Sequence, residues 1–156
     1  HQHQPPAYGV MALRDGTGGF TDLIGQASLA SGYSREEIKA SPEANILATA
    51  ALLSEWLHQR GAKSARLEDL RTELERLSGI PRTKDSQVAA FAAEAYAFDI
   101  LLAADRGFED AGIHVPEMAI AWEQAFDVES LARPRAPYVR LDLAGDRIQI
   151  ADAPMP

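Results

Sequence analysis

Carboxylates are the side chains of this sequence best suited to catalysis. A carboxylic acid can protonate a glycosidic oxygen when an apolar pocket raises its pKa. Glu94 lies among alanines and aromatic residues, whereas the other glutamates fall on helix faces that look solvated. Glu94 is therefore the exception among them, but the sequence alone assigns no catalytic residue. The glutamates that could act as such an acid are Glu36, Glu37, Glu43, Glu55, Glu73 and Glu94.

The sequence contains no recognisable motif for thiol, serine-nucleophile or zinc-dependent catalysis. The absence of cysteine excludes disulfides and thiolate chemistry, and there is no nucleophile elbow. The four histidines are scattered without a zinc-binding spacing. His1 and His3 could bind a metal, but a flexible terminus or a tag remnant is the simpler interpretation of these residues. The polar start without an initiator Met also favours a fragment or a processed piece of a longer protein. We predict no metal and no cofactor.

The glycine cluster at residues 16–19 is a further candidate site, because glycine-rich loops can cradle phosphate. It lacks the Lys-Ser/Thr ending and the preceding buried strand of a phosphate-binding loop. We therefore interpret it as a plain turn. Just before it, Tyr8, Gly9, Val10, Met11 and Leu13 form a small apolar stretch, for which a buried hinge is the simplest structure.

The elements that must position these residues are mostly helices. Ser34 and Glu37 have the spacing of a capping box, and Ser41 followed by Pro42 is a typical helix start. Apolar spacing predicts helices over residues 20–31, 34–41, 42–60, 67–77, 86–105 and 115–126. The Glu and Arg residues of the 67–77 helix are expected to form a solvated face.

Two of these helices have predicted inner faces. Trp56, near the end of the 42–60 helix, is expected to be a core or rim aromatic residue rather than a sugar platform. The buried stripe of that helix is predicted to contain Ile46, Leu47, Ala50, Ala51, Leu53 and Leu57. The inner face of the 86–105 helix is predicted to contain Val88, Phe91, Ala92, Ala95, Phe98 and Leu102.

The C-terminal part of the sequence changes character. Residues 132–137 look like a linker, and apolar residues then alternate with polar ones on both sides of Ala144, Gly145 and Asp146, which predicts a β-hairpin. The predicted fold class is mainly α, a helical domain with a small C-terminal β-hairpin. We place the helical domain at residues 7–131 and the linker and hairpin at residues 132–156.

The composition limits the partners. The 156 residues carry a formal net charge of −8, which argues against nucleic-acid binding through a basic patch. With 46% hydrophobic and 24% charged residues, the chain suits a globular domain with a real core. No apolar run looks long enough to cross a bilayer, so we predict no membrane span.

Two short segments together resemble the lysozyme-like lytic transglycosylase fold. Gly9, Val10, Met11 and Leu13 match a Gly-hydrophobic-Met-Gln-Leu segment that lines the glycan cleft in that family, with Ala12 in place of the Gln. Pro42, Asn45 and Ile46 match its Pro-x-x-Asn-Ile segment, and an Ala/Leu helix follows. More narrowly, the pattern is similar to the helical region ahead of the amidase domain in some bacterial N-acetylmuramoyl-L-alanine amidases. The resemblance covers roughly residues 7–105.

The resemblance implies a peptidoglycan-directed domain of a cell-wall hydrolase, outside the cytoplasm in the periplasm or cell wall. It implies that Tyr8, Gly9, Val10 and Met11 contact the glycan strand, with Tyr8 stacking on a sugar ring. The alternative, that Val10, Met11 and Leu13 are simply core, stays open.

The sequence also departs from the family. The family's catalytic Glu precedes the Gly-Val-Met segment, and no acidic residue precedes Tyr8 here. The family's later sugar-contacting segment, expected near residues 77–79, is also missing. Amidase or lytic transglycosylase activity is therefore expected only if the acid lies elsewhere in the full protein or on another chain. The second hypothesis is a non-catalytic helical interaction module that positions a neighbouring catalytic domain or another chain.

Overall fold

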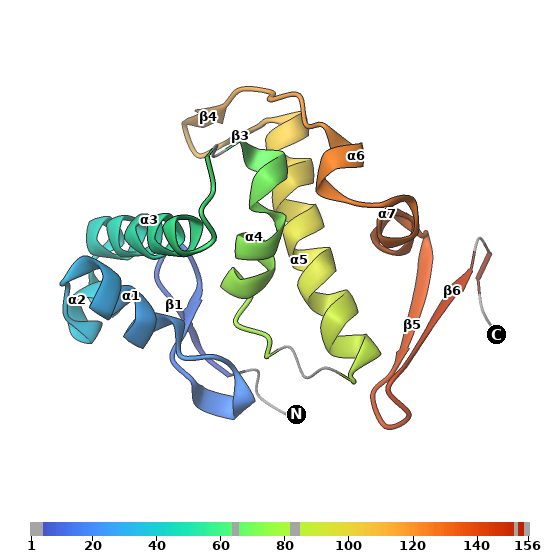
Figure 1. Ribbon diagram of the computed structural model, residues 1–156, viewed down its shortest axis with the longest axis horizontal. Helices are drawn as coiled ribbons and strands as arrows, with labels where there is room; N and C mark the ends of the chain where they lie inside the picture. Colours follow the sequence, from blue (N-terminus) through green and yellow to red (C-terminus); the bar gives the residue numbers. More distant parts are fainter. Residues whose placement is uncertain (1–4, 64–65, 82–84, 152, 155–156) are drawn as a thin grey trace. The chain divides into compact units, whose positions relative to one another are not determined.

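The computed structural model describes residues 5–63, 66–81, 85–151 and 153–154. These residues form seven α-helices and three two-stranded antiparallel sheets (Figure 1). The mainly helical class predicted from the sequence is confirmed. The chain contacts divide into two compact units: residues 1–65 with 76–81, and residues 66–75 with 82–156.

The first unit contains two short strands and three helices. Strands β1 (Ala7–Tyr8) and β2 (Leu13–Arg14) pair with each other, and a short 3-10 helix covers Thr17–Gly19. Helices α1 (Leu23–Ser31), α2 (Arg35–Ala40) and α3 (Pro42–Gln59) pack against one another (Figure 1). The 16–19 segment is therefore a tight turn region, as predicted.

The helix caps of this unit follow from the sequence. The Ser34 hydroxyl and the Glu37 carboxylate form the predicted capping box at the start of α2. The Ser41 hydroxyl accepts a hydrogen bond from the Ala44 amide, and Pro42 occupies the first turn of α3. These local signals place both helix starts to within a residue of the prediction.

The buried face of α3 differs from the predicted stripe. Ile46 and Leu47 are 46% and 45% exposed, so that part of the prediction was wrong. The buried face of α3 contains mostly small residues together with a leucine, an asparagine and a tryptophan. Its residues are Ala44, Asn45, Ala48, Thr49, Leu52 and Trp56. Small side chains allow neighbouring helices to approach closely, and Asn45 finds buried hydrogen-bond partners there. Trp56 is a core residue as predicted, with the Arg76 guanidinium 3.9 Å from its ring centroid.

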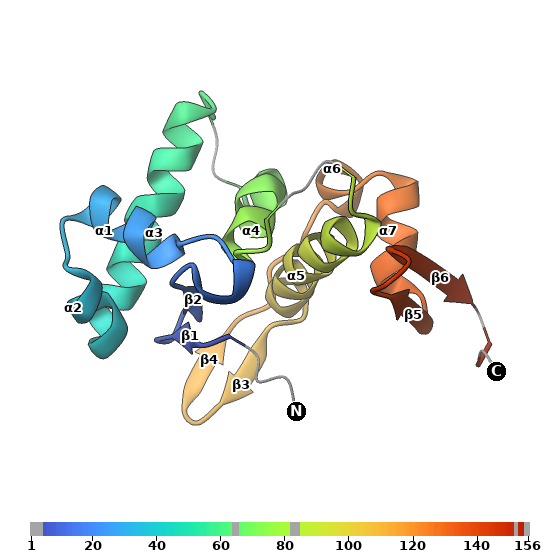
Figure 2. The same cartoon turned by 90° about the horizontal axis from the view of Figure 1, so that it is seen from below.

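The second unit is built around α5 (Gln87–Arg106). Before it come the 3-10 helix η2 (Leu67–Leu70) and helix α4 (Arg71–Leu77), whose last two residues group with the first unit. After it come the hairpin of β3 (Phe108–Asp110) and β4 (Ile113–Val115), the short helix α6 (Trp122–Ala125) and helix α7 (Val128–Arg135). The hairpin of β5 (Tyr138–Asp142) and β6 (Arg147–Ala151) follows, and Figures 1 and 2 show it beside α7.

The core of this unit also corrects two predictions. The buried residues of α5 are Phe91, Ala93, Glu94, Ala97, Phe98 and Leu101, so only part of the predicted inner face is buried. The acidic face of the 67–77 segment is not solvated, because Glu68, Glu73 and Glu75 are at most 4% exposed. A buried carboxylate requires a cationic partner. Arg71 supplies it for Glu75 at 2.7 Å and for Glu94 at 3.4 Å.

Helix α5 bears on the prediction of no membrane span. Of the described residues, only Gln87–Arg106 forms a helix long and apolar enough to cross a bilayer, with a mean hydropathy of 1.4. Its inner face is the core of the second unit, where Phe98 and Leu101 pack with Phe126. A core helix meets the same length and hydropathy criteria, so α5 is no clear membrane span.

Two predictions for the region after α5 were wrong. The 115–126 segment contains less helix than predicted, and the 132–137 segment contains more. Val115 ends strand β4, and only Trp122–Ala125 of the predicted 115–126 helix is helical. The predicted linker at 132–137 is largely the end of α7, so that prediction was wrong. The Asp127 carboxylate caps α7 by accepting from the Ser130 amide, and Arg133 pairs with Glu129 at 2.8 Å. The helix ends one residue after Pro134, which breaks the hydrogen-bond ladder.

The predicted C-terminal hairpin is confirmed. Val139 lies opposite Ile150, and Leu141 lies opposite Ile148. The hairpin turn also caps α5, because the Asp146 carboxylate accepts hydrogen bonds from the Ser86 hydroxyl and the amides of Gln87 and Val88 at 2.7–3.1 Å. The hairpin thus belongs to the same contact unit as α5.

Candidate functional site

The best candidate for a functional site in the first unit is the turn that joins β1 to β2, residues 8–12. The Ala12 amide donates a 3.1 Å hydrogen bond to the Gly9 carbonyl, which closes the turn. Gly9 and Ala12 both have positive φ, 70° and 51°. The Ala12 conformation is unusual for a residue with a side chain, so the surrounding structure must hold it in place.

Asn45 on α3 holds this turn. Its side chain is fully buried, and its Oδ1 accepts a 2.8 Å hydrogen bond from the Met11 amide. Its Nδ2 donates to the Tyr8 carbonyl at 3.2 Å and to the Ile38 carbonyl at 3.0 Å. The two stretches that the sequence analysis singled out are therefore in direct contact through one amide.

Gly9 is required for this close approach. A Cβ atom built at this position would lie 2.3 Å from the Asn45 Cγ and Nδ2 atoms. Such a contact cannot be accommodated without moving either the turn or α3. The absence of a side chain at Gly9 therefore allows the buried Asn45 amide to lie directly against the turn.

The four predicted glycan-contact residues have different environments. Tyr8 and Met11 are half-buried and Gly9 is exposed. Val10 is 64% exposed at the tip of the turn, whereas Leu13 is fully buried. The alternative that these residues are simply core holds for Leu13 and fails for Val10.

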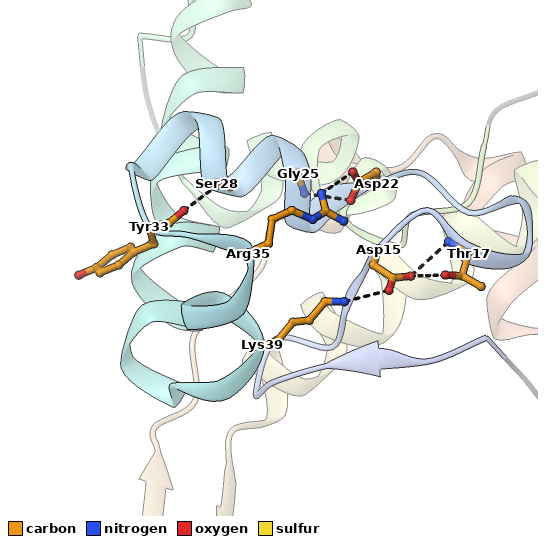
Figure 3. A network of polar contacts seen from close by, with 8 residues as sticks. All are labelled: Asp15, Thr17, Asp22, Gly25, Ser28, Tyr33, Arg35 and Lys39. Atoms are coloured by element: carbon orange, nitrogen blue, oxygen red, sulfur yellow. Dashed lines mark hydrogen bonds and ion pairs between the residues drawn. The ribbon is translucent and has the colours of Figure 1, made fainter.

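A polar network lies beside the turn and links it to α2 (Figure 3). The Asp15 carboxylate accepts from the Thr17 hydroxyl at 2.6 Å and from the Lys39 ammonium at 3.1 Å. The Lys39 Nζ also lies 4.0 Å from the centroid of the Tyr8 ring. The hydrogen bonds from Thr17 and Lys39 hold the pKa of Asp15 well below its usual range, and Asp15 in turn raises the pKa of Lys39.

A second ion pair in Figure 3 joins α1 to α2. The Asp22 carboxylate accepts from the Gly25 amide at 2.9 Å and from the Arg35 guanidinium at 2.6 Å. Partial burial alone would raise the pKa of Asp22, but the hydrogen bonds from Arg35 and Gly25 outweigh it and lower the pKa. An open pocket of about 460 Å³ lies here, lined by Asp22, Gly25, Gln26, Ser28, Leu29 and Arg35.

The carboxylates of this network are poor proton donors. A general acid must be protonated near neutral pH, so its pKa must be raised. Asp15 and Asp22 have lowered pKa values and stay ionised. Glu94 belongs to the second unit, where it is buried and bonded to Arg71, which also bonds Glu75. The Glu94 carboxylate thus forms part of an ion-pair cluster in the core.

Metal chemistry has no support in the part of the chain that the structure describes, where no three His, Asp or Glu residues gather to hold an ion. The suggested metal ligands His1 and His3 lie outside the described residues. Asp15 and Lys39 belong to no motif that is recognisable in the sequence. They are 24 positions apart, and only the fold brings the two side chains together.

Compared with protein-family models, curated proteins and solved structures, the chain has no match. The features of the first unit that bear on its function are therefore the 8–12 turn, its support by Asn45 and the ionised network beside it.

Proposed function

We propose that the first unit is a lysozyme-like, peptidoglycan-directed domain of a cell-wall hydrolase, and that it contacts glycan strands through the 8–12 turn. The observation that carries the proposal is the bonding of Asn45 to Met11 and Tyr8. The resemblance depends on two segments that are separate in the sequence. It would be weakened if the fold placed these segments far apart. Their contact through the motif residues themselves supports it.

The turn offers the groups that a neutral sugar polymer needs. The Gly9 carbonyl is already bonded to the Ala12 amide, so we assign the backbone contacts with the ligand to the exposed Val10, whose side chain adds apolar contact area. Lys39 covers one face of the half-buried Tyr8 ring, so the proposal assigns sugar stacking to the opposite face. Backbone hydrogen bonds combined with one aromatic face suit a hydroxyl-rich, uncharged ligand.

We propose binding rather than cleavage for this unit by itself. Glycosidic cleavage needs a protonated acid, and the two carboxylates of the network are both held ionised. In the full cell-wall hydrolase, amidase or transglycosylase chemistry would take its acid from another segment or chain. The location that goes with this function is the periplasm or the cell wall.

The test is to incubate the purified chain with peptidoglycan sacculi, sediment them, and analyse both fractions by mass spectrometry. We expect the protein in the pellet and no released muropeptides. Val10→Asp should shift protein to the supernatant because it places a charge at the tip of the turn. Val128→Asp is the matched control, since Val128 is 89% exposed and lies in the second unit. A chain that stays in the supernatant refutes the proposal.

The second candidate function, a non-catalytic interaction module, is favoured by one observation. Ile46 and Leu47 leave an exposed apolar strip on α3, beside the buried face of the same helix. This function predicts a stable complex with a neighbouring domain or chain and no affinity for glycan. Under this function, Leu47→Asp should abolish co-purification of that partner. Neither the unchanged chain nor this variant should sediment with sacculi.

A further inference from the structure

The second unit contains a pocket of about 540 Å³ that the proposed function does not use. It lies where the C-terminal half of α5 meets α6 and the end of α7. The lining residues are Phe98, Leu102, Asp105, Arg106, Trp122, Pro134 and Arg135. Its volume falls within the range of small-molecule sites.

The wall of the pocket is aromatic and held in place. The Trp122 ring is tilted against Phe98, with 5.2 Å between the centroids, and stacks on Phe126 at 6.3 Å. The Asp105 carboxylate accepts from the Ile120 amide at 3.2 Å and from the Trp122 indole N–H at 3.4 Å. The indole is half-buried and fixed from two sides, so its orientation exists before any ligand binds.

Two guanidinium groups line the same pocket. Arg106 and Arg135 are exposed, and neither forms an ion pair with any residue within the described ranges. The guanidinium of Arg135 lies 5.5 Å from the Trp122 ring centroid. On the same helix, Arg133 is instead bonded to Glu129 at 2.8 Å. In a chain of net charge −8, these two arginines bring positive charge to the lining of one pocket.

The charged residues of the pocket lining indicate the charge of the ligand. Two guanidinium groups and the Asp105 carboxylate leave a formal net charge of +1 on the lining, which matches a monoanion better than a polyphosphate. Guanidinium groups bind carboxylates with two parallel hydrogen bonds. The remaining lining, Phe98, Leu102, Pro134 and the Trp122 ring, is apolar.

We propose that this pocket binds a small organic carboxylate with an apolar or aryl body. The carboxylate pairs with Arg106 and Arg135, and the apolar body lies against Trp122. This site belongs to the second unit, so its existence does not depend on the glycan-binding proposal for the first.

The test uses two probes, 4-phenylbutyrate and octanoate, with the neutral amide of each as a matched comparison. The whole chain carries two tryptophans, so its ¹H–¹⁵N spectrum has two indole signals. The Trp122 signal should shift in a saturable way with either acid. The Trp56 signal, from a buried residue of the first unit, should stay in place. Each amide should bind about tenfold more weakly than its acid, because it loses the charged hydrogen bonds.

Three variants complete the experiment. Arg106→Gln and Arg135→Gln should each weaken acid binding by about fivefold to tenfold. Arg133→Gln should leave it unchanged, because Arg133 is bonded to Glu129 and does not line the pocket. All three positions are on the surface, so unchanged thermal melting curves will show that the variants fold. The proposal is refuted if neither acid shifts Trp122 below about 10 mM, a concentration typical of nonspecific association. It is equally refuted if acids and amides bind alike, or if Arg133→Gln weakens binding as much as the other two.

Discussion

Replacing Asn45 by alanine tests the central feature of the first unit. The substitution removes three hydrogen bonds from a fully buried side chain and leaves the Met11 amide and the Tyr8 and Ile38 carbonyls without their partner. A buried polar group left unsatisfied costs about 1–3 kcal/mol. Water can reach the turn side of the site, so we take the lower part of the range for each group. The free energy of unfolding of the first unit should fall by about 3–5 kcal/mol.

The assay is urea unfolding followed by Trp56 fluorescence in a Trp122→Phe background, so that the signal reports the first unit alone. Gln59→Ala on the same helix is the control, because Gln59 is exposed and its amide bonds the Glu55 carboxylate on the same helix at 3.0 Å. That change should stay within about 0.5 kcal/mol. A loss below about 1 kcal/mol for Asn45→Ala would contradict the reasoning, since it would mean that the turn does not depend on this amide.

Three further predictions concern the turn, its ion pair and the hairpin. Gly9→Ala should destabilise the first unit by about 1–3 kcal/mol more than Gly19→Ala in urea unfolding, the cost of forcing a new atom into a packed site. Both glycines have positive φ, but only at Gly9 would the new Cβ meet Asn45. Asp15 has a folded-state pKa below its ordinary value of 3.8, so its stabilising effect is fully present above that pH and is lost on acidification below it. Asp15→Asn should therefore make stability fall less steeply between about pH 5 and pH 2 than in the unchanged chain, as measured by acid titration of Trp56 fluorescence. Asp146→Ala should lower the melting temperature of the second unit and increase hydrogen exchange at the first turn of α5, because it removes three hydrogen bonds to that turn; unchanged exchange there would contradict the capping role.

Local sequence signals predicted the starts of α2, α3 and α5 to within a residue, because the causes of these starts are local. The hydroxyls of Ser34, Ser41 and Ser86 each cap a helix by bonding an amide three residues later. The C-terminal hairpin was equally visible, since the alternation of apolar residues and the Asp142 to Gly145 turn contact lie within a few residues. None of these elements needs a distant partner to form its first hydrogen bonds.

The faces of the helices were harder to predict. Apolar spacing favoured Ile46 for the core of α3, but the structure buries Asn45 instead, because the turn supplies that amide with partners. Similarly, Glu73 and Glu75 looked solvated and are buried. Glu75 is buried beside Arg71, which also reaches Glu94 from another helix. Helical periodicity describes hydrophobicity, and it cannot show that a polar group will find a buried partner.

The candidate sites also combine features that the sequence encodes locally with contacts that depend on the tertiary structure. The sequence by itself determined the helical class, the caps and the identity of the two segments, Tyr8 to Leu13 and Pro42 to Ile46, because each is encoded by neighbouring residues. Only the tertiary structure decided that Asn45 holds the turn and that Lys39 pairs with Asp15. It also decided that two arginines share a pocket with Trp122. These residues are 13 to 37 positions apart, and their contact depends on how the chain folds back on itself.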